Sequence, residues 1–105
     1  AARTPEPVTR LHLLMSARGD AVSTCLAQLG PGDEVLLLDE GVHCLAPDGE
    51  HPAQLSALLA AAARVCALET DVRARVPGTH PAVRLVGDDD WVRMVHRHRH
   101  VLSWT

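Results

Sequence analysis

Short, unbroken apolar runs alternate along this chain with segments whose apolar residues recur every three or four positions. Residues 35–38 are all apolar, which is typical of a strand in a parallel sheet that is covered on both faces. Residues 20–29 instead place their apolar side chains on one stripe of a helix. This alternation predicts an α/β fold, a three-layer sandwich with a mostly parallel five-stranded sheet.

The same patterns predict the individual elements. Strands are predicted over residues 9–15, 34–38, 65–68, 83–86 and 101–104, the last of them at an edge of the sheet. Helices are predicted over residues 20–29, from Pro52 onward and over 88–100, with shorter helical turns over 42–46 and 71–75. Asp20 is the predicted N-cap of the first helix. Because ligands collect at the carboxyl ends of parallel strands, we expect a site near residues 16–20, 39–44 and 69–71.

Length and composition restrict the class of protein. A chain of 105 residues predicts one domain, here residues 9–105 after a flexible lead-in over 1–8. No apolar stretch approaches the roughly 20 residues of a membrane span, and the first residues lack the apolar core of a signal peptide. The three cysteines are widely spaced and odd in number, which favours a reducing compartment. A cytoplasmic protein without membrane contact is therefore expected.

Charge and motifs argue against several kinds of ligand. The net charge is −3, and the arginines are scattered except over 93–99, so neither a basic face nor direct nucleic-acid binding is predicted. The Gly-Pro-Gly run at 30–32 follows a helix, so it is not a nucleotide loop. His96, His98 and His100 alternate with arginines, which favours a solvated helix end over a metal site. No metal and no cofactor are expected.

The cysteines are the remaining candidates for chemistry. Cys66 lies within an apolar strand, and Cys25 lies on the apolar stripe of the first helix, so both patterns favour inert core residues. Cys44 follows Gly41 at a strand-to-helix junction, where helix amides are expected to lower the pKa of the thiol. From the residues alone, Cys44 is the leading nucleophile candidate. No CxxC pair supports a thioredoxin-type mechanism.

Several stretches in this order resemble the TusB/DsrH family, the smallest subunit type of the DsrE-like sulfur-relay proteins. They are LHLL at residues 11–14, LGPGD at 29–33, VLLLDEGV at 35–42, ALETDVRAR at 67–75, DDWV at 89–92 and VLSW at 101–104. The resemblance implies a DsrE-like fold and assembly into a heterohexamer with TusC/DsrF-like and TusD/DsrE-like subunits.

In that family the assembly passes persulfide sulfur between carrier proteins of the TusA or TusE/DsrC type. One branch serves 2-thiolation of the tRNA wobble uridine, and the other serves dissimilatory sulfur oxidation. The resemblance thus implies a component of a sulfurtransferase complex that is not expected to act alone. The implied transfer of sulfur requires neither a metal nor a nucleotide, because a sulfur carrier needs only an accessible thiolate.

The resemblance changes the order of the site candidates. The main reactive cysteine of such assemblies resides in the TusD/DsrE-type subunit, and Cys25 matches a cysteine in the first helix of DsrH-type members. Cys44 stands where the family usually shows a small residue and becomes the second candidate. Two roles stay open, a persulfide carrier that uses Cys25 and a structural subunit in which Cys25 is buried. An unrelated flavodoxin-like ligand-binding domain is a third alternative.

Overall fold

A computed structural model of the protein describes residues 9–46 and 52–105, so the predicted lead-in lies outside the described residues. Five strands form one sheet in the order β4-β3-β2-β1-β5, and every pairing is parallel. The predicted α/β class is confirmed. The strands are β1 (Arg10–Leu14), β2 (Glu34–Leu37), β3 (Arg64–Leu68), β4 (Arg84–Val86) and β5 (His100–Trp104).

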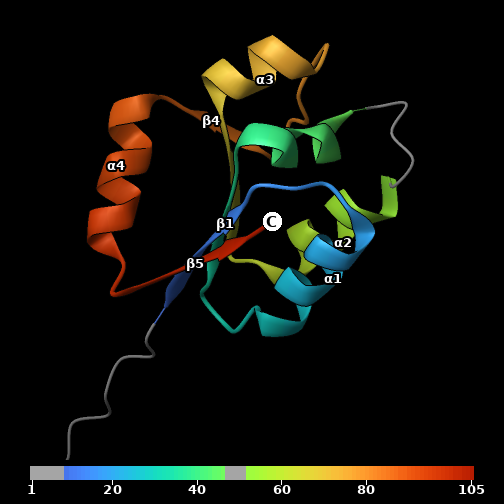
Figure 1. The fold of residues 1–105 in the computed structure, drawn as a ribbon. Helices are drawn as coiled ribbons and strands as arrows, with labels where there is room; N and C mark the ends of the chain where they lie inside the picture. The colour runs from blue at the N-terminus through green and yellow to red at the C-terminus, as the bar shows by residue number, and fades with distance from the viewer. Residues whose placement is uncertain (1–8, 47–51) are drawn as a thin grey trace, which may run out of the picture.

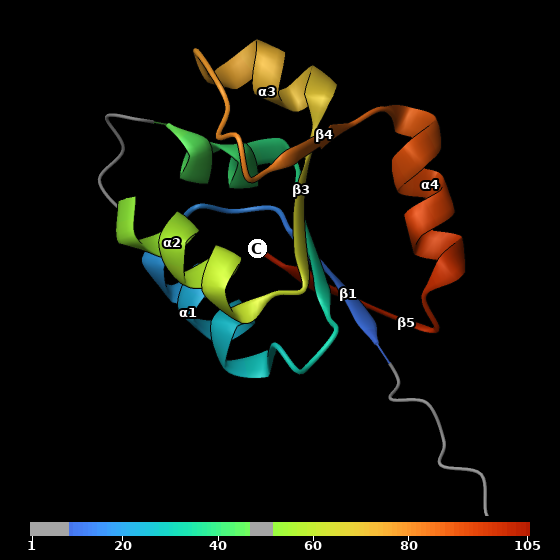
Figure 2. The same cartoon turned by 180° about the vertical axis from the view of Figure 1, so that it is seen from behind.

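Helices cover both faces of this sheet, as Figure 1 and the reverse view in Figure 2 show. The helices α1 and α2 lie on one face together with the 3-10 helix η1, and α4 lies on the other, which makes three layers. The short helix α3 packs against η1. The bounds are α1 Gly19–Gln28, η1 Asp39–Leu45, α2 Pro52–Ala61, α3 Glu69–Arg75 and α4 Asp88–Arg97. Among the described residues, no helix is both long enough and apolar enough to cross a membrane.

The unbroken apolar run at 35–38 is explained by burial on both faces of the sheet. Val35 and Leu37 join the core cluster under α1 and α2, whereas Leu36 and Leu38 join the cluster under α4. Successive side chains of a strand point to opposite faces, so both sets must be apolar. Each fully buried side chain of this size contributes about 1.5–3 kcal/mol through removal from water.

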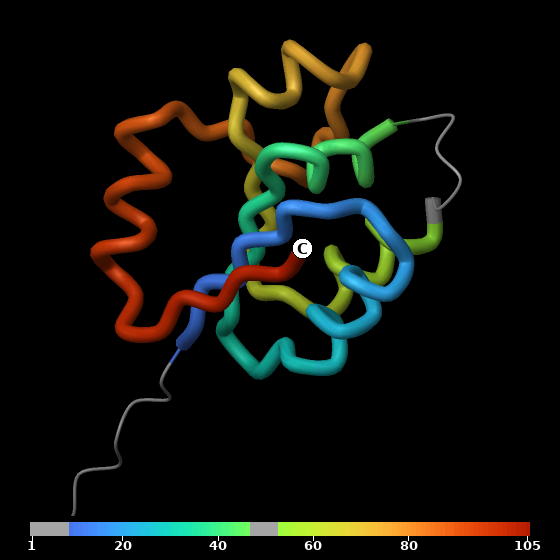
Figure 3. The backbone as a smooth tube through the Cα atoms, viewed as in Figure 1, coloured from blue at the N-terminus to red at the C-terminus, as the bar shows by residue number. Residues whose placement is uncertain are grey.

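The last strand does not lie next to the strand that precedes it in the chain. From β4 the chain crosses through α4 to the far side of β1, where β5 pairs with β1 from Arg10 opposite His100 to Leu14 opposite Trp104. Figure 3 shows this path along the backbone. The strand order therefore reverses at β1, and such a reversal is where parallel sheets commonly open a crevice beyond their carboxyl ends.

The predicted bounds of four helices differ from those in the structure. The turns predicted over 42–46 and 71–75 begin earlier, as η1 and α3, and the differences in α1 and α4 have identifiable causes. Helix α1 begins at Gly19, with Arg18 as its N-cap residue, so Asp20 lies in the first turn instead. Its Oδ1 atom accepts a hydrogen bond of 2.9 Å from the backbone N–H of Ala21, and a carboxylate at that place still suits the helix dipole.

Helix α4 ends at Arg97 and does not continue to His100, which instead begins β5. The physical reason is Glu34 on β2. Its Oε2 atom lies 2.9 Å from Nε2 of His98 and accepts a hydrogen bond of 3.0 Å from Arg97. These contacts hold the chain at the sheet and end the helix there. His96 and His100 consequently do not share a helix face.

Candidate functional site

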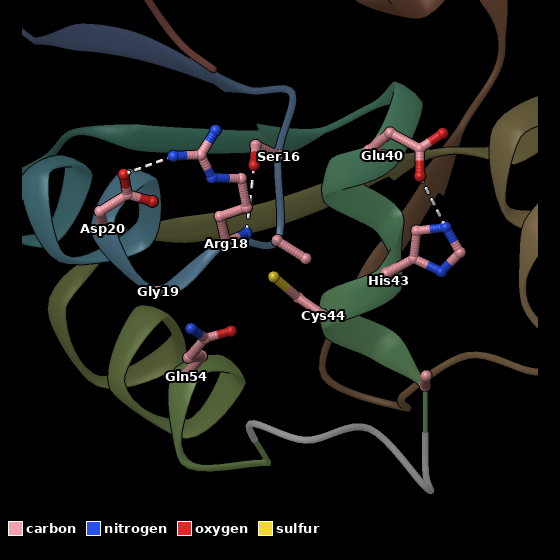
Figure 4. A pocket seen from close by; sticks show the side chains of 10 residues that line it. Ser16, Arg18, Gly19, Asp20, Glu40, His43, Cys44 and Gln54 are labelled. Atoms are coloured by element: carbon pink, nitrogen blue, oxygen red, sulfur yellow. Dashed lines mark hydrogen bonds and ion pairs between the residues drawn. The ribbon is translucent and has the colours of Figure 1, made fainter.

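A pocket of about 700 Å³ opens at the carboxyl ends of β1 and β2. It lies between the loop that joins β1 to α1, the 3-10 helix η1 and helix α2 (Figure 4). Two of the three segments expected at a site, 16–20 and 39–44, contribute to its walls, whereas 69–71 does not. The lining residues are Ser16, Ala17, Arg18, Gly19, Asp20, Glu40, His43, Cys44, Ala46 and Gln54.

The wall formed by η1 is fixed by a close backbone contact at Gly41. A Cβ atom at this position would lie 1.9 Å from the backbone oxygen of Leu14, at the end of β1. Only glycine leaves room for that approach. The backbone of Asp39 also takes a left-handed conformation with φ of 52°, which is uncommon for a residue other than glycine.

Segment 69–71 supports the pocket from behind. Asp71 accepts a hydrogen bond of 2.6 Å from the backbone N–H of Asp39, which stabilises the unusual conformation there. Arg75 of α3 donates to Asp39 at 2.8 Å and to both Glu40 and Asp71 at 3.3 Å. Glu40 in turn lies 2.9 Å from the His43 ring nitrogen Nε2. These contacts tie η1 to α3.

Cys44 is the thiol that faces this pocket. Figure 4 shows its sulfur pointing into the space between Arg18 and Gln54, although the residue is only 6% exposed. Burial raises the pKa of the Cys44 thiol to about 11. The predicted lowering of this pKa is therefore wrong. The physical reason is that the thiol is almost completely enclosed at the wall of the pocket, and this burial outweighs a backbone hydrogen bond that lowers the pKa.

Cys25 and Cys66 are less accessible than Cys44. Cys25, on α1, has no exposed surface, and it packs in the core between this helix and the sheet. Burial raises the pKa of its thiol to about 11, and the neighbouring Cys44 and Asp33 add to the shift. Cys66 is 2% exposed and lies on the opposite face of the sheet, toward α4. Burial raises the pKa of this thiol as well.

The polar groups around the pocket suit a small polar ligand group. The buried Oε1 atom of Gln54 has no hydrogen-bond partner among the described residues, and an unpartnered buried acceptor is costly unless a ligand satisfies it. The Arg18 guanidinium is held 2.8 Å from Asp20. Within residues 9–46 and 52–105, no group of three or more His, Cys, Asp or Glu side chains could hold a metal ion.

Sequence reasoning missed a buried polar cluster outside the pocket. His12 is fully buried on β1, and its Nε2 atom lies 2.8 Å from Oδ2 of Asp33, which is 1% exposed. Trp104 of β5 donates a hydrogen bond of 3.0 Å from Nε1 to Nδ1 of His12. The signal was present in the sequence, because His12 interrupts an otherwise apolar strand and a buried polar side chain needs partners.

Three comparisons with known proteins agree with this structure. The model of the family described as "DsrH like protein" matches residues 15–101. Protein TusB of Erwinia tasmaniensis is 37% identical over 98 residues, which cover 90% of this chain and 99% of that protein. In a solved structure, the protein of unknown function MTH1491 from Methanobacterium thermoautotrophicum has the same fold. Its TM-score is 0.74 at 19% identity, over 92% of this chain and 99% of the other.

The match spans most of the domain and includes the loop after β1, all of η1 and all three cysteines. It agrees with the resemblance seen in the sequence motifs. The chain belongs to the DsrH-like protein family.

Proposed function

We propose that this chain is a subunit of a cytoplasmic sulfur-relay complex, in which it has a structural and docking role and does not itself carry sulfur. Membership of the DsrH-like family and the similarity to TusB support the complex. The observation that carries the structural role is the complete burial of Cys25, the cysteine that the family resemblance singles out.

A sulfur carrier must present a thiolate to the sulfur of its partner, because the thiolate is the attacking species in such exchanges. Cys25 meets neither requirement in this fold. Its side chain is enclosed by the core, and with a pKa of about 11 only about one thiol in ten thousand would be ionised at neutral pH. Completing the assembly requires no such thiolate.

The second candidate role is sulfur transfer through Cys44. The observation in its favour is the position of the sulfur in the wall of a pocket that also contains the unpartnered Gln54 oxygen. Transfer would proceed by attack of the Cys44 thiolate on the outer sulfur of a partner persulfide, and the partner thiolate would leave. The high pKa of Cys44 ranks this role below the structural one.

Of the two sulfur pathways, we assign the chain to 2-thiolation of the tRNA wobble uridine ahead of dissimilatory sulfur oxidation. The similarity to TusB supports this order. The partners are then TusC/DsrF-like and TusD/DsrE-like subunits in a heterohexamer, with TusA- or TusE/DsrC-like proteins as the sulfur carriers. The chain itself makes no direct contact with tRNA in this scheme.

The deciding experiment measures persulfide transfer in a complex reconstituted from this chain and its two paralogous subunits. Labelled sulfur is followed into the acceptor carrier for the parent complex and for Cys25→Ala, Cys44→Ala and Cys66→Ala. We expect Cys25→Ala to transfer at the parent rate. A loss of transfer in Cys25→Ala with an intact hexamer would contradict the structural role, and a loss confined to Cys44→Ala would establish the second candidate.

The pathway is tested in the organism that carries the gene. Deletion should abolish 2-thiouridine in tRNA, measured by mass spectrometry of nucleosides, and a Cys25→Ala copy should restore it. Normal 2-thiouridine in the deletion strain, together with impaired oxidation of reduced sulfur, would favour the oxidation pathway instead.

A further inference from the structure

Four of the ten arginines of the chain gather at a second pocket, on the face of the sheet that α4 covers. This pocket has a volume of about 180 Å³ and lies between α4 and the strands β3 and β4. One acidic residue, Asp90, lies among the arginines. The lining residues are Arg64, Cys66, Arg84, Val86, Asp90, Arg93, Met94 and Arg97.

The geometry of the strands explains how residues so far apart meet. Arg64 and Cys66 are two positions apart on β3 and therefore share a face. Arg84 is the register partner of Cys66 on β4 and points to that same face. Arg93 and Arg97 complete the group from α4, where a spacing of four residues places them side by side. Linear spacing did not predict that these four arginines gather at one pocket.

The acidic groups nearby do not cancel this charge. The carboxylate oxygens of Glu34 lie 3.0 Å from a guanidinium nitrogen of Arg97 and 3.8 Å from one of Arg64. A carboxylate oxygen of Asp90 lies 3.7 Å from a guanidinium nitrogen of Arg93. Arg84 has no ion pair with any residue in the described part of the chain, and its side chain is exposed. At least one guanidinium is thus available to a ligand, beside three that are only partly neutralised.

We propose that this pocket binds a small tetrahedral oxyanion of the phosphate or sulfate class. Guanidinium groups match such oxygens with paired N–H donors, and their bonds to anions are stronger than neutral hydrogen bonds. The volume is below the roughly 300 Å³ at which drug-sized ligand pockets begin, which favours a single ion over a nucleotide. This site lies on the opposite face of the sheet from Cys44 and does not depend on the proposed sulfur-relay role.

One thiol, Cys66, lies beside the charged groups of this pocket. Cys66 forms part of the pocket wall at 2% exposure. Burial raises the pKa of this thiol, and Glu34 raises it further, whereas Arg64, Arg84 and Arg97 lower it. These opposing contributions show that the charges of Glu34 and of three arginines all lie close to the Cys66 thiol. No covalent step at Cys66 is part of the proposal.

The test is calorimetric titration of the full chain with phosphate and with sulfate at constant ionic strength, with chloride as the replacing anion. We expect one saturable site. Because one charge-assisted contact is removed, Arg84→Gln should weaken binding by about tenfold or more, and Arg84→Lys should restore part of it. The matched control is Arg73→Gln on α3, which removes the same charge from an exposed residue paired with Glu69 at 2.6 Å.

Unchanged binding in Arg73→Gln, with both variants melting like the parent protein, would support the pocket. Equal weakening in Arg73→Gln and Arg84→Gln would show an effect of net charge alone and overturn the proposal, as would the absence of saturable heat. A single-stranded RNA is the third titrant. If it displaces phosphate and its own binding depends on Arg84, the pocket is a phosphodiester contact and the small-ion proposal is wrong.

Discussion

The indole Nε1 of Trp104 donates a hydrogen bond of 3.0 Å to Nδ1 of His12, and the two rings stack with 12° between their planes. Because an indole N–H can only donate, Nδ1 of His12 must accept, which places the proton of the neutral ring on Nε2, facing Asp33. The contact joins the end of β5 to the centre of β1. It assigns Trp104 to closure of the core, against which its partly buried side chain packs.

Replacing Trp104 should therefore destabilise the fold through one lost bond. In Trp104→Phe a ring remains, but the buried Nδ1 atom of His12 loses its donor, and an unsatisfied buried group costs about 1–3 kcal/mol. The free energy of unfolding, measured with urea, should fall by that amount. Trp91→Phe on α4 is the matched control. An equal loss in both variants would contradict the assigned role of the hydrogen bond.

Asp33 should make stability depend on pH in the acid range. Burial alone would raise the pKa of this carboxyl, but hydrogen bonds from Gly30, His12 and Arg10 outweigh it and lower the pKa below its usual value. A group with a lowered pKa in the folded state adds stability above its unfolded pKa, about 3.9, and loses it as the pH falls through the folded value. The free energy of unfolding should thus decline below about pH 4.

The variant Asp33→Asn should remove that acid dependence and lower the free energy of unfolding at pH 7 by about 3 kcal/mol, because it breaks a buried, hydrogen-bonded charge. Asp20→Asn, at an exposed carboxylate, is the control and should change stability little. A parent protein and an Asp33→Asn variant with parallel pH profiles would show that Asp33 does not cause the dependence.

Gly41→Ala should disrupt the wall of the Cys44 pocket. The new methyl group would overlap the backbone oxygen of Leu14, and a backbone atom in a central strand cannot move aside cheaply, so a loss of about 3 kcal/mol is expected. Gly78→Ala is the matched control, because a Cβ there has no neighbour within 4 Å. Chemical denaturation of both variants checks the expectation, and equal stability would contradict the close contact.

The three thiols should react slowly and in a defined order. Cys44 lines an open pocket, whereas Cys25 has no exposed surface and Cys66 has 2%. Native alkylation with iodoacetamide, followed by mass spectrometry, should label Cys44 before the other two. Since the pKa of Cys44 is about 11, its rate should rise about tenfold per pH unit above neutrality. Faster labelling of Cys25 than of Cys44 would contradict the structure and reopen the carrier role.

Local patterns were sufficient to predict much of this fold. The apolar run at 35–38 and the helical stripe at 20–29 report burial directly, so the sheet and α1 followed from them. The position of the pocket beside segments 16–20 and 39–44 also followed, because the ends of parallel strands meet at one edge.

Long-range contacts account for what the sequence patterns missed. Helix α4 ends where Glu34, far away in the chain, binds Arg97 and His98. The arginine pocket exists because Arg64 and Arg84 lie on neighbouring strands of one sheet face. The pKa of Cys44 depends on how deeply the thiol is buried against neighbouring elements, which a residue pattern does not show.

The crossover that places β5 beside β1 also bears on how the protein avoids aggregation. Until β5 docks, β1 has a bare edge of unpaired N–H and C=O groups next to strongly apolar side chains, a template on which another chain could pair. The pairing of Leu14 with Trp104 joins distant parts of the chain, and contacts of such wide separation form slowly. Docking of β5 therefore covers this edge late in folding, and the Trp104–His12 contact fastens β5 there. The less buried strand β5 then forms the outer edge of the sheet in place of the apolar β1.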